Sequence, residues 1–426
     1  MRTLDLPAAT PAPIGSAPSA VDGAGVADVP AARPMRICIL MQNLGWGGSE
    51  LHTLELTRAL SARGHAVTLV ELGLPVFEAH PVVRELGVRV VRIDLGKPPE
   101  AVGFTEWRRA FRGLGCEVAV FSKGWVFAGN AMLDLAARLT FRRYLTIEHV
   151  TPPPRPRKGT RRYFGAIPGS WWWRKMLLEQ GPPVYIRSVG PQRIVGVSHA
   201  VTEELRGYAF PRRKLQPIPN GIDGERYRPD PAARAATRAA WNIPAEALVL
   251  GTVGRLTLEH KGQDIGVALF ARLVAEHPDR DLRYVLVGDG PDRHLLEQQI
   301  AALGLGERVR LVGHTERPWE AHAALDLFVM PSHFEGIGLV LLEAMASGAV
   351  PIAFGVGGVR DVIADPALGW LVAPEDREGM YRALQAAVAQ PVEERAAMGR
   401  RGRAHVLRHY RAAEQYRKIV TLVEGG

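Results

Sequence analysis

The feature that most constrains the fold is an alternation of short apolar runs with amphipathic segments, and the chain carries this alternation twice. The first series begins with MRICILM at residues 35–41, followed by a glycine-containing turn, a helical pattern and the apolar run HAVTLVEL. Short continuous apolar runs are typical of strands buried on both faces of a parallel sheet. Strand, helix and strand in succession predict a right-handed βαβ unit.

Both series continue with the same pattern. Further strands of the first are expected at residues 88–93, 117–121, 144–147, 194–197 and 215–218. A connection rich in Pro and Gly, PNGIDGERYRPDP, follows, and the alternation restarts at LVLGTVG and continues to VPIAF. We therefore expect an α/β protein with two facing, doubly wound, Rossmann-like domains. Ligands bind at the carboxyl ends of the strands in such sheets, so the crevice between the domains is the predicted site.

Composition and pattern divide the chain into four parts. Residues 1–34 are rich in Ala and Pro and poor in large apolar residues, which predicts a disordered tail. We expect Rossmann-like domains at 35–224 and 225–395, and a basic helical segment at 396–426. The 426 residues, of which 47% are hydrophobic and 23% charged, suffice for two cores.

Charge and apolar content limit the surroundings in which the chain works. The formal net charge of +9 favours an anionic partner, and nucleic acid, an acidic substrate or an anionic bilayer would each fit. No apolar run reaches the roughly 18 residues that a membrane span needs. The two cysteines, Cys38 and Cys116, are expected to be reduced core residues of a cytoplasmic protein.

The most informative stretch is PSHFEGIGLVLLEAMASGAVPIAFGVGG. Glu335 precedes Gly336 and Gly338, whose missing side chains let a ligand approach the backbone. A helical pattern begins at Leu339, and the free N–H groups of its first turn form an anion site. Glu343 follows one turn into this helix. The arrangement suits a ligand with both phosphates and hydroxyls, namely a nucleotide sugar.

The motifs resemble those of the family 4 retaining glycosyltransferases of GT-B fold. FEGIGLVLLEAMASG is similar to the E-x7-E motif of that family, and VSHAVTEEL, IPNGID, VGRLTLEHKGQD and LVGDGPDR stand in the family's order. The N-terminal GGSE is similar to the family's first-turn glycines. The resemblance implies two facing domains, an acceptor-binding first and a donor-binding second, with the C-terminal helix crossing back to the first.

The resemblance also implies roles for single residues. Glu335 would contact the hydroxyls of the donor sugar, and Glu343 the ribose of the nucleotide. Arg255 and Lys261 would clamp the diphosphate, and His149 would touch the donor sugar beside the reaction centre. The other expected donor-binding positions are Gly47, Gly48, Gly288, Gly336, Ile337, Gly338, Leu339 and Val340.

Three other residues receive no role in sugar binding or catalysis. His199, in VSHA, is expected to be structural. Many members of the family have a glutamate shortly after the pair that is Gly357 and Gly358 here, whereas this chain continues with VRDVI. No sugar contact is therefore assigned to Arg360 or Asp361.

The activity implied by the resemblance is retaining transfer of a sugar from a nucleotide-diphosphate donor to a lipid-linked or glycan acceptor, in cell-envelope glycan or glycolipid biosynthesis. It needs neither a metal nor another cofactor, and a donor phosphate oxygen accepts the proton of the acceptor. Two alternatives remain open. One is a GT-B-fold phosphorylase or sugar-nucleotide epimerase, and the other is a non-catalytic nucleotide-sugar-binding protein.

The segment Arg155–Lys175 predicts a surface contact. It carries seven Lys or Arg and no acid, together with Tyr163, Phe164 and the run Trp171–Trp173. Aromatic residues interleaved with basic ones suit an anionic bilayer, which would place the protein peripherally on the inner face of the cell membrane. Alternatively, the tryptophans belong to the core or line the acceptor cleft. We expect no nucleic-acid partner, because no nucleic-acid-binding fold accompanies the segment.

Overall fold

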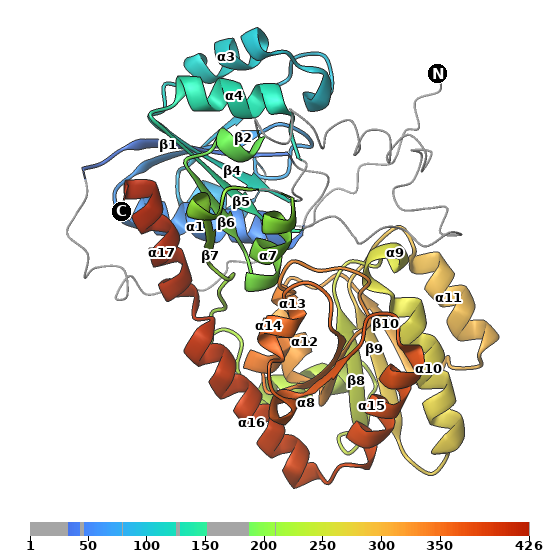
Figure 1. The fold of residues 1–426 in the computed structure, drawn as a ribbon. Helices are drawn as coiled ribbons and strands as arrows, with labels where there is room; N and C mark the ends of the chain where they lie inside the picture. Colours follow the sequence, from blue (N-terminus) through green and yellow to red (C-terminus); the bar gives the residue numbers. More distant parts are fainter. Residues whose placement is uncertain are drawn as a thin grey trace.

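A computed structural model describes residues 33–42, 47–78, 80–124, 128–150, 187–208 and 210–425. Within these residues the chain forms two parallel sheets with helices packed on them (Figure 1). The expected fold class, α/β with two Rossmann-like domains, is confirmed. The predictions for the segment Arg155–Lys175 and for most of the tail at 1–34 lie outside the described residues.

The first sheet consists of parallel strands in the order β3-β2-β1-β4-β5-β6-β7. They are β1 (Arg36–Met41), β2 (Ala66–Glu71), β3 (Arg89–Arg92), β4 (Val118–Lys123), β5 (Arg143–Glu148), β6 (Arg193–Gly196) and β7 (Leu215–Pro217). Each was predicted from its apolar run, and the observed ends differ from the expected ones by at most two residues.

Helices cover both faces of the first sheet. One face carries α1 (Gly48–Ala62), α7 (His199–Gly207) and α17 (Ala412–Glu424), and the other carries α3 (Phe104–Gly113) and α4 (Ala131–Thr140). Smaller elements are α2 (Pro81–Glu85), η2 (Pro99–Ala101) and η3 (Arg212–Lys214). In β1, Ile37, Ile39 and Met41 join the core of the first face, whereas Cys38 and Leu40 join the core of the second. This alternation explains why the strand is apolar throughout.

The second sheet is also parallel, in the order β10-β9-β8-β11-β12-β13. Its strands are β8 (Leu248–Val253), β9 (Leu282–Val287), β10 (Val309–Gly313), β11 (Leu327–Met330), β12 (Val350–Phe354) and β13 (Trp370–Val372). We did not predict β13. It is a three-residue edge strand that pairs with β12, and so short a run gives little periodic signal.

The helices of the second domain pack around one continuous core. They are α8 (Pro231–Ala240), α9 (Leu258–Lys261), α10 (Gln263–Glu276), α11 (Arg293–Ala302), α12 (Pro318–Ala323), α13 (Leu339–Ala346), α14 (Val359–Val362), η4 (Pro366–Leu368), α15 (Arg377–Ala389) and α16 (Val392–His409). The basic helical segment was expected from residue 396, and α16 begins four residues earlier, at Val392.

The C-terminal segment crosses back to the first domain later than we expected. The predicted boundary at residue 396 falls inside α16, which stays on the second domain, where Val406 and Tyr410 join the core. The chain then leaves the helical conformation at Tyr410, and α17 packs beside α1, with Tyr416 and Ile419 in the core of the first domain (Figure 1).

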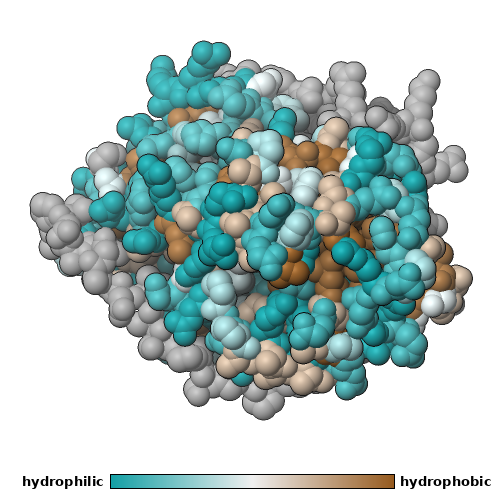
Figure 2. All heavy atoms as spheres, turned by 90° about the horizontal axis from the view of Figure 1, so that it is seen from below, coloured by the Kyte–Doolittle hydropathy of each residue, from teal (hydrophilic) through white to brown (hydrophobic). Residues whose placement is uncertain are grey.

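The surface of the second domain is mainly polar. Seen from below, hydrophilic side chains cover most of this face and hydrophobic ones show between them (Figure 2). Large exposed apolar residues, such as Leu303 and Val392, are scattered along the described chain. None of the helices that the structure describes is both long and apolar enough to cross a bilayer.

Candidate functional site

A glycine-rich turn joins β11 to α13 at the carboxyl edge of the second sheet. Gly338, the N-cap of α13, has a φ of 74°, and a Cβ on it would lie 2.9 Å from Cε of Met330. A left-handed residue in so tight a place must be glycine. The first N–H groups of a helix have no partner within it, so this N-terminus offers donors to an anion.

Gly336 lies where the two domains touch. A Cβ on it would be 1.9 Å from the carbonyl oxygen of His149 and 3.3 Å from Val197, both in the first domain. Its own carbonyl accepts hydrogen bonds from Ser198 Oγ at 3.1 Å and from the Gly358 N–H at 2.8 Å. Any side chain at Gly336 would push the domains apart at the predicted donor site.

Glu335 and Lys261 form an ion pair beside this turn. Lys261 Nζ donates to Glu335 Oε1 at 2.7 Å, and the carboxylate is buried. Burial alone would raise the pKa of Glu335, but the charge of Lys261 and the hydrogen bonds from Lys261 and Ser332 oppose burial, and the pKa is lowered. Glu335 is therefore an ionised, oriented acceptor for hydroxyl groups at neutral pH.

The short helix α9 is clamped to the loop that carries Glu335. The His260 ring stacks on Phe334 with centroids 4.2 Å apart, and the His333 N–H donates to the His260 carbonyl at 2.9 Å. Burial and the neighbouring Lys261 lower the pKa of His260 to about 4, so its ring is neutral at pH 7. These contacts fix Lys261 relative to Glu335.

Arg255 follows β8 and is exposed, facing the other domain. Glu50, in the first turn of α1, is buried, and burial raises its pKa, while the charge of Arg255 opposes the rise. Ser49 Oγ also donates to Glu50 Oε2 at 2.9 Å. Arg255 therefore lies near the first turn of α1, whereas Lys261 is paired within its own domain.

Glu343 points into the second domain from the middle of α13. His322 Nε2 lies 3.1 Å from Glu343 Oε2, and both side chains are buried. Burial, followed by the charge of Glu343, raises the pKa of the Tyr227 phenol well above its usual value. The partners of Glu343 are thus His322 and Tyr227, neither of which the sequence indicated. Its predicted contact with the ribose stays a prediction.

His149 follows β5, with its side chain buried among first-domain groups. Its Nε2 lies 3.1 Å from Ser122 Oγ, which accepts a hydrogen bond from Thr53 Oγ1 at 2.8 Å. The ring meets His52 edge-on, with centroids 4.8 Å apart. Burial lowers the pKa of His149 to about 3, so the imidazole is neutral at pH 7. The part of His149 that touches the glycine turn is its carbonyl group.

The predicted glycines of the first turn also lie at this contact. Gly47 is the N-cap of α1 and Gly48 its first residue, and a Cβ on Gly48 would be 3.3 Å from Cδ1 of Leu339. The N-terminal ends of α1 and α13 therefore meet across the domain boundary. Next to Leu339, Ile337 is buried and Val340 is half-buried.

Gly288, at the end of β9, packs directly against Gly254. A Cβ on it would lie 2.0 Å from the Gly254 carbonyl oxygen, so the two strand ends could not approach each other with any larger residue. Its N–H donates to the Gly313 carbonyl at 2.8 Å. The structure thus explains Gly288 without a ligand, and a donor contact there stays a prediction.

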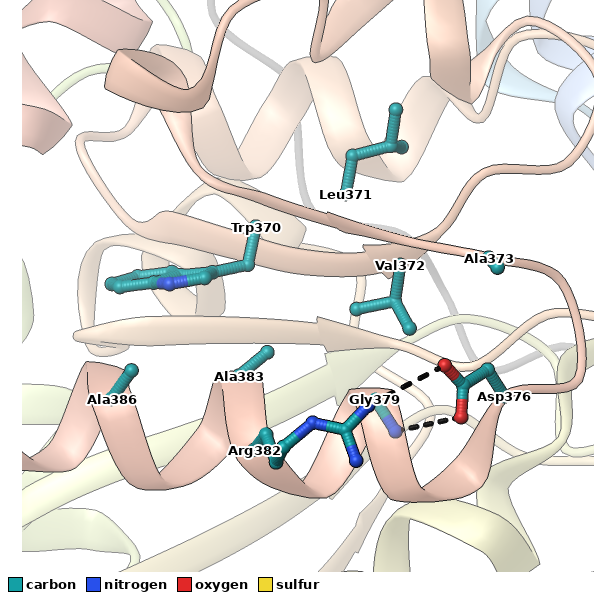
Figure 3. A pocket seen from close by; sticks show the side chains of 9 residues that line it. All are labelled: Trp370, Leu371, Val372, Ala373, Asp376, Gly379, Arg382, Ala383 and Ala386. Atoms are coloured by element: carbon teal, nitrogen blue, oxygen red, sulfur yellow. Dashed lines mark hydrogen bonds and ion pairs between the residues drawn. The ribbon is translucent and has the colours of Figure 1, made fainter.

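A separate hollow of about 390 Å³ lies between β13 and α15 (Figure 3). The ring of Trp370 lies over Ala383 and Ala386, and the charged residues Asp376 and Arg382 pair with each other at 3.8 Å. β13 is the terminal strand of its sheet, whereas the glycine turn follows β11 inside it. We therefore do not assign this hollow to the donor site.

In the part of the chain that the structure describes, no three His, Cys, Asp or Glu side chains are arranged to hold a metal ion. The charged and polar groups at the domain contact can bind an anion through cations and N–H groups, and hydroxyls through the Glu335 carboxylate.

Two family models match the chain. The model for "Glycosyl transferases group 1" matches residues 233–405, and the model for "Glycosyltransferase Family 4" matches residues 46–226. The matches follow one another and together span most of the chain. Both halves of the chain therefore match models of glycosyltransferase families, and the resemblance to the family 4 glycosyltransferases is confirmed.

Curated relatives support the same assignment over part of their length. A D-inositol 3-phosphate glycosyltransferase of Saccharomonospora viridis is 34% identical over 50% of this chain and 51% of the relative. A GDP-mannose-dependent alpha-(1-6)-phosphatidylinositol monomannoside mannosyltransferase of Mycolicibacterium smegmatis is 31% identical over 50% of this chain and 57% of the relative. The chain thus spans about half the length of these relatives.

Solved structures share the fold. Anabaena Alr3699/HepE in complex with UDP and glucose superimposes with a TM-score of 0.74 at 18% identity, covering 92% of this chain and all of that one. At this identity the likeness shows the fold, and the predicted GT-B architecture is confirmed.

Proposed function

We propose that this protein transfers a sugar from a nucleotide-diphosphate donor to a glycan or lipid-linked acceptor, with retention of configuration and without a metal ion. The observation that carries the proposal is the ionised Glu335, held by Lys261 in the turn before α13, where the next residue, Gly336, packs directly against the first domain. The names of the relatives and the UDP and glucose bound by the Anabaena protein agree with such a donor.

In this proposal the diphosphate binds at the N-terminal end of α13. Arg255, Lys261 and the N–H groups of Leu339 and Val340 supply positive potential where negative charge develops as the glycosidic bond breaks. Donors fixed in advance stabilise the leaving diphosphate without reorganisation. Glu335 contacts the sugar hydroxyls, which holds the oxocarbenium-like ring in place while the diphosphate leaves.

The acceptor hydroxyl attacks from the same face that the diphosphate leaves. A donor phosphate oxygen accepts the acceptor's proton, so no protein carboxylate has to act as nucleophile. His149 contributes a neutral wall on the first-domain side, because an imidazole with a pKa of about 3 is uncharged at neutral pH and cannot act there as a general acid. Glu343 anchors the ribose from within the second domain.

We also propose that the protein works in the cytoplasm, on the inner face of the cell membrane, within cell-envelope glycan or glycolipid biosynthesis. The support is the sequence of Arg155–Lys175, since each basic residue near an anionic bilayer contributes about 1 kcal/mol. Replacing Trp171–Trp173 with Ala should reduce co-sedimentation with vesicles that contain anionic lipid, and should leave neutral vesicles unaffected. Unchanged binding to anionic vesicles would remove this part of the proposal.

The proposed reaction is tested by incubating the purified protein with labelled nucleotide sugars and either cell-envelope lipid extract or glycan intermediates. We expect transfer from one class of nucleotide sugar. NMR of the product should show the same anomeric configuration as in the donor, and the rate should be the same with and without excess chelator. Strict dependence on a divalent metal or inversion at the anomeric carbon would contradict the mechanism. Donor turnover with phosphate or water alone would favour a phosphorylase or an epimerase.

A further inference from the structure

Hydrogen bonds join the two domains next to the glycine turn. Ala200 N–H, in the first turn of α7, donates to Asp361 Oδ2 at 3.0 Å. α7 belongs to the first domain and Asp361 to the second, so a carboxylate of one domain caps a helix of the other. Ser198, the N-cap of α7, donates through its own Oγ to the Gly336 carbonyl.

Asp361 is also tied to the point where the chain crosses between domains. Tyr410 OH donates to the Asp361 carbonyl at 3.0 Å. The Tyr410 carbonyl accepts from the Ile222 N–H at 2.7 Å, and the Ala412 N–H donates to the Ile222 carbonyl at 3.0 Å. Ile222 lies on the first crossing and Tyr410–Ala412 on the second, so the two crossings are hydrogen-bonded to each other beside Asp361.

The same short segment reaches the donor turn. Gly358, three residues before Asp361, donates to the Gly336 carbonyl. A hollow of about 510 Å³ opens between α7 and α14, lined by His199, Ala200, Glu203, Glu204, Arg360 and Asp361. This hollow lies where α7 and α14 would otherwise pack closely against each other. The angle between these two helices therefore depends on the hydrogen bonds that Ser198 and Ala200 make to the second domain.

We propose that Asp361 is a positioning residue for the transfer reaction: it fixes the angle between the domains and so holds the first-domain wall against Glu335. The inference rests on the proposed transferase function. Asp361 acts through α7 and the crossing at Tyr410, and it makes no contact with the donor. The neighbouring ion pair between Arg360 and Glu204 has a distance of 4.0 Å, and the arginine side chain is 55% exposed. An exposed pair of this kind contributes little to the contact between the domains.

Asp361→Ala removes the acceptor for the Ala200 N–H. We expect kcat to fall about tenfold, as the loss of one interdomain hydrogen bond would produce. The dissociation constant of the free nucleotide diphosphate should stay within twofold, because the second domain binds it alone. Asp361→Asn keeps an acceptor oxygen and should restore most of kcat, whereas Arg360→Ala should behave as the wild type. Tyr410→Phe should lower kcat less than Asp361→Ala.

Small-angle X-ray scattering of the same variants tests the domain angle without any substrate. Asp361→Ala should give a larger radius of gyration, and Asp361→Asn and Arg360→Ala the wild-type profile. Unchanged kcat and scattering in Asp361→Ala, or an equal loss in nucleotide affinity and kcat, would overturn the inference. If the wild type transfers no sugar, the proposed function fails, while the scattering still decides whether Asp361 sets the angle.

Discussion

The facing edges of the two sheets differ in how they carry charge. At the second-domain edge the two carboxylates of the motif are each held by a partner, Glu335 by Lys261 and Glu343 by His322. At the first-domain edge the glycine turn meets the His149 carbonyl and the side chains of Val197 and Ser198, all uncharged. The imidazole of His149 is neutral and buried beside Ser122 Oγ. In the proposed reaction, the second domain thus supplies the fixed charges beside the leaving diphosphate. The first domain supplies uncharged groups beside the sugar that is transferred.

The first domain contains a cluster of charged side chains that is buried at the ends of β4 and β5. Lys123 Nζ is 3.3 Å from Asp134 and 3.5 Å from Glu148, and Arg187 lies 3.4 Å from Asp134. These four side chains are almost wholly buried. Such a cluster stabilises the fold only while every charge keeps its partners, so we interpret it as structural. In the Lys261–Glu335 pair of the second domain, by contrast, the lysine side chain stays partly exposed.

The largest effect is expected for Lys123→Met. Removing the cation leaves the carboxylates of Asp134 and Glu148 buried with less compensation, which should cost about 3–5 kcal/mol of the free energy of unfolding. Urea denaturation measures this cost. The matched control is Lys418→Met at an exposed helical pair, which should change stability by less than about 0.5 kcal/mol. Equal stability of the two variants would contradict a structural role for the buried cluster.

Glu335→Ala should abolish most transfer without unfolding the protein. Losing one preorganised group at a developing charge typically costs about 10²–10³-fold in rate. The rate of labelled-sugar transfer measures the loss, and thermal denaturation checks the fold. Glu297→Ala removes an exposed helical pair and serves as the control. Near-normal turnover by Glu335→Ala would show that the site lies elsewhere.

Stability should fall as the pH drops below about 6.5, and His149 should contribute to the fall. Its pKa is about 3 when folded and near 6.5 when unfolded, so between these values the unfolded state binds more protons. The stabilisation is complete above pH 6.5 and is lost towards pH 3, with a slope of up to about 1.4 kcal/mol per pH unit for one proton. Urea denaturation between pH 7 and 4 should give a shallower slope of stability against pH for His149→Phe than for the wild type. Identical slopes for His149→Phe and the wild type would contradict a buried, neutral His149.

The fold could be predicted almost completely from the sequence, because long apolar runs at regular spacing leave few alternatives. β13 was missed, since three residues at a sheet edge carry no periodic pattern. We predicted the crossing to the first domain too early in the chain, because the sequence of α16 and α17 resembles one continuous basic helix. The break at Tyr410 depends on contacts with Ile222 and Asp361, which are distant in the sequence.

The candidate site could be predicted only in its residue types. Glu335 and Lys261 were both identified, but their pairing across 74 positions depends on how α9 is clamped to the loop at Phe334. No local pattern links Glu343 to His322. No role was assigned to Asp361 from the sequence either, because its partner is the backbone N–H of Ala200, and a backbone group leaves no pattern in the sequence.

The most direct test of the account is a thermal-shift comparison of the wild type with Glu335→Gln across a panel of nucleotide sugars and their free nucleotide diphosphates. A ligand at 100 times its dissociation constant adds about 2.7 kcal/mol to stability, which is readily measured. We predict that the matching nucleotide diphosphate shifts both proteins equally, and that its sugar adds a further shift in the wild type alone. An equal response of both proteins to the nucleotide sugar, or no response to any member of the panel, would contradict the claim that Glu335 holds the donor sugar.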